Sequence, residues 1–150
     1  MANELVEEEA KVIFRLEKDD DDYPPDDYES LWATRMPDGM YRIDNIPFYI
    51  RGISPGDVIT VIKDDRQVFF DRLVVPSANS VLRVIVYNAD EVSVVRDSLR
   101  DLGCESELSH VPQLISIEIP AEVDFDVITN FLEAGETRNA WEYETASIRH

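Results

Sequence analysis

Apolar and polar side chains alternate in short runs along the first half of the chain. Val12, Phe14 and Leu16 share one face of such a run, which predicts a half-buried strand over residues 11–17. Similar runs, separated by turns rich in Gly, Pro and Asp, cover residues 28–35, 40–43, 58–62 and 67–75. Four or five short strands joined by such turns predict a small antiparallel β-sheet or barrel-like half.

The second half carries helical as well as strand periodicity. A nearly continuous apolar run over residues 81–87 predicts a central strand. Apolar residues then recur at helical spacing in two segments, with Asp90 and Asp124 as expected N-caps and Gly103 and Gly135 as expected stops. Further strands are expected over residues 104–111, 113–119 and 140–148. The resulting β-α-β-β-α-β order is typical of a ferredoxin-like fold, in which two helices cover one side of a four-stranded antiparallel sheet.

These patterns together predict an α+β protein with two halves. A β-rich, barrel-like subdomain is expected over residues 11–78 and a ferredoxin-like α+β subdomain over residues 79–150, with the boundary at Pro76-Ser-Ala-Asn79. Residues 1–10 lack a β pattern, so we expect a flexible N-terminal segment there.

Charge adds a prediction about partners. The chain has 14 Lys+Arg against 32 Asp+Glu, a net charge of −18. Residues 1–29 hold 12 acids and 3 bases, residues 30–78 hold 6 of each, and residues 79–150 hold 14 acids and 5 bases. Such a surface repels nucleic acid and anionic membranes and accelerates encounter with basic proteins. We therefore expect a basic protein partner, no nucleic acid and no membrane; the acids also serve solubility, and that reading stays open.

The sequence also bears on the compartment. No apolar run approaches the roughly 18 residues that cross a bilayer, and the acidic N-terminus has no positively charged region of a secretory signal. The single cysteine, Cys104, suits a reducing environment. We expect a cytoplasmic protein, either a monomer or a homodimer.

Motifs for catalysis and metal binding are missing from the sequence. His110, His150 and Cys104 do not form a ligand cluster, and the Asp19–Asp22 run lacks the glycine and glutamate of an EF-hand loop. No Gly-x-Ser-x-Gly, P-loop or Gly-x-Gly-x-x-Gly motif occurs. We expect no cofactor, no metal site and no catalytic residue, which favours a protein that is not an enzyme.

The neutral middle of the chain holds the candidate binding residues. They are Trp32, Arg42, Asp44, Asn45, Tyr49, Arg51 and Asp57. One interpretation is structural, with Trp32 in the core and Asn45 and Asp57 capping turns. The other is a shallow pocket, in which Trp32 and Tyr49 form flat walls while arginine and Asp44 side chains supply opposite charges.

Motifs in the same segment resemble a known family. Glu-Ser-Leu-Trp-Ala at residues 29–33, Asp-Asn-Ile-Pro-Phe-Tyr-Ile-Arg-Gly-Ile at 44–53 and Gly-Asp-Val at 56–58 are similar to the bacterial family called domain of unknown function 4265. The likeness continues through residues 80–84, 102–104 and 141–144. The resemblance implies a bacterial, stand-alone, cytoplasmic protein, and it transfers no catalytic residue.

Three hypotheses of function follow. The first is an acidic protein-binding module, such as an immunity or inhibitor protein that neutralises a basic partner. The alternative is a regulatory domain that senses a small molecule at a ferredoxin-like interface, an analogy from the fold alone. The third is an enzyme with a site centred on Asp44, Tyr49 and Arg51.

Overall fold

The computed structural model describes residues 8–150, and the chain divides into two units, the first ending at Ser77 and the second spanning Ala78–His150. Residues 1–7, which make up most of the expected flexible segment 1–10, lie outside the described residues. The last two residues of that segment, Glu9 and Ala10, belong to a strand.

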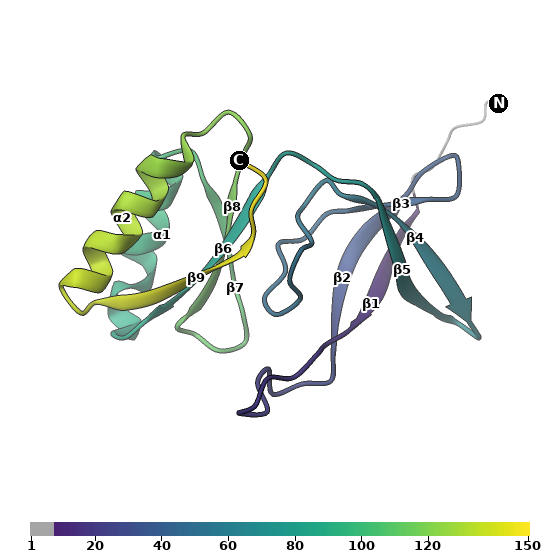
Figure 1. Ribbon diagram of the computed structural model, residues 1–150, viewed down its shortest axis with the longest axis horizontal. Helices are drawn as coiled ribbons and strands as arrows, with labels where there is room; N and C mark the ends of the chain where they lie inside the picture. Colours follow the sequence, from purple (N-terminus) through teal and green to yellow (C-terminus); the bar gives the residue numbers. More distant parts are fainter. Residues whose placement is uncertain (1–7) are drawn as a thin grey trace. The chain divides into compact units, whose positions relative to one another are not determined.

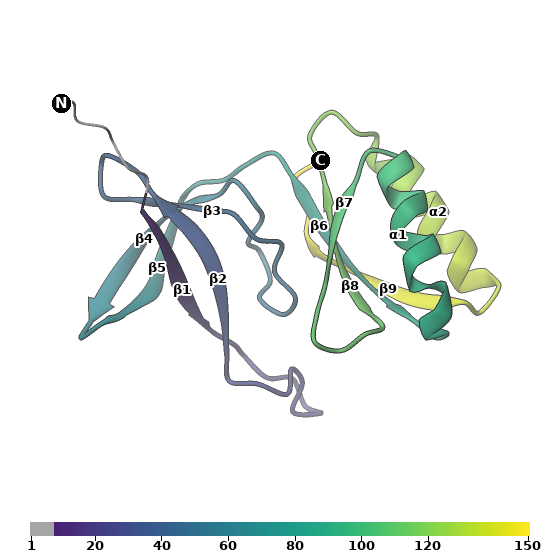
Figure 2. The same ribbon diagram turned by 180° about the vertical axis from the view of Figure 1, so that it is seen from behind.

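The first unit is a closed barrel of five strands (Figures 1 and 2). The strands are β1 (Glu9–Arg15), β2 (Tyr28–Arg35), β3 (Tyr41–Ile43), β4 (Val58–Asp64) and β5 (Gln67–Val75). Consecutive strands pair antiparallel, whereas β5 closes the barrel on β1 in parallel. A five-stranded meander must close this way, because its first and last strands run in the same direction. The predicted barrel-like half is confirmed.

Side chains alternate across the barrel wall as the sequence pattern predicts. Val12 and Phe14 of β1 point inward and are fully buried, and the Phe14 ring stacks on Phe70 at 4.7 Å between centroids. The same alternation turns Trp32 outward, because its neighbours Leu31 and Ala33 are the buried ones. The indole is 43 % exposed, so the expectation that Trp32 belongs to the core is wrong.

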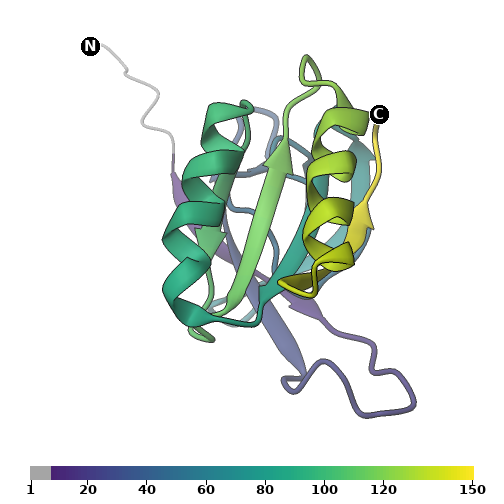
Figure 3. The same ribbon diagram turned by 90° about the vertical axis from the view of Figure 1, so that its left-hand side faces the viewer.

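The second unit is a four-stranded sheet with two helices on one side (Figure 3). Its elements are β6 (Ser80–Val86), a 3₁₀ turn (Ala89–Glu91), α1 (Val92–Asp101), β7 (Glu105–Leu108), β8 (Leu114–Ile119), α2 (Phe125–Thr137) and β9 (Trp141–Ser147). The strand order is β7-β8-β6-β9, with every neighbouring pair antiparallel. Within residues 8–150, neither helix has the length and apolar character needed to cross a membrane.

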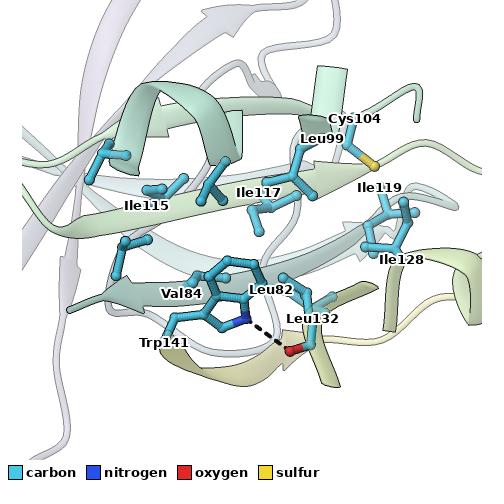
Figure 4. Packing of buried hydrophobic residues seen from close by; sticks show 13 residues of the cluster. Leu82, Val84, Leu99, Cys104, Ile115, Ile117, Ile119, Ile128, Leu132 and Trp141 are labelled. Atoms are coloured by element: carbon cyan, nitrogen blue, oxygen red, sulfur yellow. Dashed lines mark hydrogen bonds between the residues drawn. The ribbon is translucent and has the colours of Figure 1, made fainter. Parts of the chain in front are cut away.

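The core of the second unit lies between the helices and the sheet (Figure 4). Leu82 and Val84 of β6 and Ile117 of β8 face the buried stripe of the helices. Trp141 of β9 is buried, and its indole N–H donates to the backbone carbonyl of Leu132 at 2.9 Å. This hydrogen bond satisfies the one polar atom of the indole and fixes the ring beneath α2.

The helix starts agree with the sequence signals in one case and not in the other. Asp124 caps α2 as predicted, since its carboxylate accepts the Asp126 N–H at 2.9 Å. Asp90, in contrast, lies inside the 3₁₀ turn that precedes α1, and the capping side chain is Asn88, which accepts the Asp90 N–H at 3.0 Å. The 3₁₀ turn precedes the apolar stripe of α1, and the spacing of that stripe therefore does not indicate which residue caps the turn.

The helix stops likewise differ. Gly103 follows α1 at φ +99°, and the N–H of Cys104 reaches back to the Leu99 carbonyl, a Schellman ending. Gly135 does not end α2, so that prediction is wrong. The helix continues to Thr137, and Asn139 takes the left-handed position at φ +60°.

Candidate functional site

Trp32 lies at the centre of one group of candidate residues. Its backbone N–H donates to the Asn45 side chain at 2.7 Å, and its carbonyl accepts the Asp44 N–H at 2.9 Å. Asp44 in turn accepts the Thr34 hydroxyl at 2.6 Å and lies 3.5 Å from the Arg42 guanidinium. Arg42 and Asp44 therefore pair with each other, so the opposite charges expected of a pocket neutralise locally.

Tyr49 belongs to a second group, whose backbone is bound by Glu29, a residue that was not among the sequence-based candidates. The Glu29 carboxylate accepts three consecutive backbone N–H groups, from Phe48 at 2.6 Å, Tyr49 at 3.0 Å and Ile50 at 2.8 Å. Three converging N–H groups form a strong anion-binding geometry, and here the anion is part of the chain. Glu29 thus sets the conformation of the long loop between β3 and β4.

Asp57 is structural. It is fully buried, and its two carboxylate oxygens accept the N–H groups of Ser54 at 2.9 Å and Ser77 at 2.7 Å. It fixes both the turn before β4 and the end of the first unit, as expected of a turn cap. Arg51 lies on the exposed part of the same loop. Of the seven candidates, Trp32, Arg42, Asp44 and Asn45 form one connected group. Tyr49 belongs to the loop held by Glu29, and Asp57 belongs to the turn before β4.

Within residues 8–77, the loop between β1 and β2 is the most acidic stretch of the first unit. Residues 17–27 contain seven acids and one base, and all seven acids are exposed. The single base holds the loop together: Lys18 Nζ donates to the carbonyl oxygens of Pro24 at 2.7 Å and Asp26 at 3.2 Å, and lies 3.4 Å from the Asp27 carboxylate. The only cation of this loop is thereby engaged within the loop itself.

Asp19 gives the same loop a defined backbone. One of its carboxylate oxygens accepts the N–H groups of Asp21 at 2.9 Å and Tyr23 at 3.0 Å. The Tyr23 ring, 43 % exposed, meets Tyr49 edge to face at 5.9 Å. The loop therefore presents carboxylates around an aromatic side chain on a backbone that is already ordered.

The chain's thiol lies in the second unit and is not an activated nucleophile. Burial, together with the nearby Glu118 and Glu105 carboxylates, raises the pKa of Cys104 to about 11. Burial and the carboxylates of Glu107 and Glu105 also raise the pKa of Glu118 above its usual range. At neutral pH the thiol is protonated, which is the opposite of what nucleophilic catalysis requires.

Comparison with known proteins identifies the family. The sequence matches the family described as a domain of unknown function (DUF4265) over residues 29–143. The chain belongs to the DUF4265 family. A crystal structure of a hypothetical protein from Neisseria gonorrhoeae resembles this DUF4265 chain with a TM-score of 0.75 and 20 % sequence identity, covering 93 % of this chain and 96 % of the other. That likeness concerns the fold alone. No curated protein matches the sequence.

The DUF4265 segment begins at Glu29, the carboxylate that the sequence analysis passed over. Its partners lie 19 to 21 residues further along the chain, so no local spacing links them. The one available signal was its place at the start of the Glu-Ser-Leu-Trp-Ala motif. Lys18 and Asp19 were missed for a different reason: they stand in a charged run, where a structural role is hidden by composition.

Proposed function

We propose that the protein is an acidic, non-enzymatic protein-binding module of the immunity or inhibitor type, which binds a basic protein in the cytoplasm. The observation that carries this proposal is the ordered acidic loop at residues 17–27, with its internally engaged Lys18 and its exposed carboxylates. Its net charge of −6 lies within 11 residues. Such a surface attracts cationic proteins over a distance of about 10 Å at ordinary ionic strength.

The order of the loop supports specific rather than diffuse attraction. A flexible acidic tail loses conformational entropy when a partner fixes it, at roughly 1–2 kcal/mol per residue. Lys18 and Asp19 already fix this backbone, so that cost is borne on folding and not on binding. Tyr23 within the loop adds an aromatic anchor of the kind enriched at binding hot spots.

Affinity capture from the native cytoplasm, at low and moderate salt, tests this function. The informative variant is Asp20→Asn/Asp21→Asn/Asp26→Asn, which removes three charges but spares the structural Lys18 and Asp19. The matched control removes three exposed carboxylates of the second unit, Glu91→Gln/Asp101→Asn/Glu122→Gln. We expect one basic protein in stoichiometric amount, lost with the loop variant and at higher salt, and kept with the control. If both variants lose the partner equally, the net charge of the protein and not the loop itself would account for binding. A capture that recovers no basic protein would refute the proposal.

The second unit supports a finer assignment and a second candidate function. We infer a ferredoxin-like fold from its β-α-β-β-α-β order and its strand order β7-β8-β6-β9. Domains of this topology that sense small molecules pair through sheet edges, which is a fold-level analogy. Here the edges disfavour pairing. Glu136 accepts the Tyr143 N–H on β9 at 3.1 Å, and β7 carries Glu105 and Glu107. Protein binding is therefore the better-supported function.

A further inference from the structure

The sheet of the second unit has two outer strands, β7 and β9, and each one has a row of backbone groups on its outer edge. In an antiparallel ladder, alternate residues turn their N–H and C=O groups toward the paired strand, and the residues between them turn these groups outward. Such an outward row pairs readily with a strand of another chain unless a side chain covers it. In Figure 3, α1 lies over the β7 side of the sheet and α2 over the β9 side.

On β7, the outward backbone groups of Ser106 are covered by Arg96 of α1. The Ser109 N–H donates to the Leu114 carbonyl at 3.3 Å, just past the end of β7, so the strand register makes Glu107 bond β8 and turns Ser106 outward. The Arg96 guanidinium donates from Nη2 to the Ser106 carbonyl at 3.0 Å and from Nε to the Ser106 hydroxyl at 2.9 Å. The carbonyl at the outer edge of β7 is therefore already bonded within the chain.

On β9, the outward backbone groups of Tyr143 are covered by Glu136 of α2. The Tyr87 N–H donates to the Ala140 carbonyl at 3.1 Å, so the strand register makes Glu142 bond β6 and turns Tyr143 outward. The Glu136 carboxylate accepts the Tyr143 N–H at 3.1 Å. A donor side chain thus covers a carbonyl on one edge, and an acceptor side chain covers an N–H on the other.

Any edge-to-edge pairing of two copies meets two of these side chains, which we call the edge guards (Arg96 and Glu136). Pairing of β7 with β7 meets two Arg96 side chains, pairing of β9 with β9 meets two Glu136 side chains, and the mixed pairing meets one of each. An incoming residue must exchange two N–H···O bonds with Ser106 or Tyr143, and an edge guard already occupies one of the groups needed. Leaving the incoming group without a partner costs a factor of about ten in the association constant.

Charge repulsion is a second obstacle to pairing, and salt separates it from the edge guards. The edge strands carry Glu105, Glu107, Glu142 and Glu144, and the whole chain has a net charge of −18. At 1 M salt the screening length falls to about 3 Å, so this repulsion is largely removed. The hydrogen bonds of the edge guards are direct contacts, and they persist under the same conditions.

We propose that Arg96 and Glu136 prevent the chain from pairing through its sheet edges with a second copy of itself, even when charge repulsion is screened. This inference goes beyond the proposed function, because it concerns the second unit and does not involve the acidic loop. It assigns a role to two helix residues whose side chains bond the backbone of a neighbouring strand.

Sedimentation equilibrium in 1 M salt tests the inference with Glu136→Ala and the matched control Glu133→Ala. Both residues are exposed on α2 and carry the same charge, but Glu133 meets only the Tyr143 hydroxyl, at 3.4 Å. We expect the original chain and the control to be monomeric. The association constant of Glu136→Ala should be about 100-fold higher, because pairing of β9 with β9 loses two obstacles of about tenfold each. Glu136→Gln keeps an acceptor oxygen and should remain monomeric.

Hydrogen exchange at the Tyr143 amide identifies the surface that pairs. In Glu136→Ala this exchange should slow as the protein concentration rises, because a second copy then supplies the acceptor. Association without such slowing, no more association than in Glu133→Ala, or a dimer of the original chain in 1 M salt would each overturn the role of Glu136.

The pair Arg96→Ala and Arg100→Ala tests β7 in the same way, since Arg100 bonds only the Asp97 side chain on α1. Urea unfolding of both variants first establishes that they fold. We expect association of Arg96→Ala alone, and no gain over the control would overturn the role of Arg96.

Discussion

Gly135 is the position where local propensity and packing make opposite predictions about stability. It lies inside α2, where alanine is normally about 1 kcal/mol more favourable than glycine. A Cβ at this position, however, would overlap the Cε2 and Cζ2 atoms of Trp141 and lie 2.5 Å from its Nε1, where ordinary contact begins at 3.4 Å. The difference between 3.4 Å and 2.5 Å means that the indole would have to move by about 1 Å or more.

Several contacts prevent the indole from moving at low cost. Its N–H donates to the Leu132 carbonyl, Phe131 lies 5.5 Å from its ring, and the Arg138 guanidinium lies 4.6 Å above it. Overpacking a core costs about 1–3 kcal/mol, and loss of a buried hydrogen bond costs about 1–3 kcal/mol more. After the gain in helix propensity of about 1 kcal/mol, Gly135→Ala should lower the free energy of unfolding by about 1–5 kcal/mol.

Urea unfolding followed by circular dichroism measures this change. Ala134→Gly, at the exposed neighbouring position, isolates helix propensity and should cost about 1 kcal/mol. In a Trp141→Leu background the cost of Gly135→Ala should largely disappear, because the overlapping ring is gone. Stabilisation by Gly135→Ala, or an equal cost in both backgrounds, would refute the packing argument.

Three further predictions concern carboxylates and the thiol. Glu29→Gln should lower the free energy of unfolding by about 1–3 kcal/mol, because an amide has one acceptor oxygen for the three N–H groups that the carboxylate binds. The control Glu17→Gln, at an exposed position, should leave the free energy of unfolding unchanged. Equal effects of the two substitutions in urea unfolding would contradict this. Cys104, buried and with a pKa of about 11, should react with Ellman's reagent at pH 8 only after unfolding; rapid reaction of the folded protein would be inconsistent with it. Folding raises the pKa of Glu118 above its usual value of 4.5, so ionisation of this carboxyl opposes folding at higher pH. Glu118→Gln should therefore stabilise the protein at pH 7 and lose that benefit at about pH 3. A stabilisation that does not depend on pH would exclude this cause.

The sequence pattern was sufficient where one local rule decided the structure. Residues 28–35 and 67–75 were predicted with the bounds of β2 and β5, because alternation and turn residues agree there. Trp32 shows how two signals conflict: the alternation around Leu31 and Ala33 turned it outward, but its apolar character favoured the core. Gly135 is similar, since glycine often ends helices and its contact with Trp141 is invisible in one dimension.

The candidate site was only partly predictable. Asp57 was expected to cap a turn, and its carboxylate does accept the N–H of Ser54, three residues earlier in the chain. Such a short separation can be recognised in the sequence. The carboxylate that shapes the loop of Tyr49 comes from Glu29, 20 residues away, and such pairings depend on how strands stack around the barrel. Likewise, which outer side chains of neighbouring barrel strands lie side by side depends on strand register, which alternation within one strand does not determine.

The association rate constant of the captured basic partner, measured against ionic strength, tests the central proposal most directly. Docking on the acidic loop predicts a rate that falls steeply with salt, by about tenfold or more between low and physiological ionic strength, and a shallower slope for Asp20→Asn/Asp21→Asn/Asp26→Asn than for the matched control in the second unit. A rate that does not depend on salt, or identical slopes for the two variants, would contradict binding through this loop.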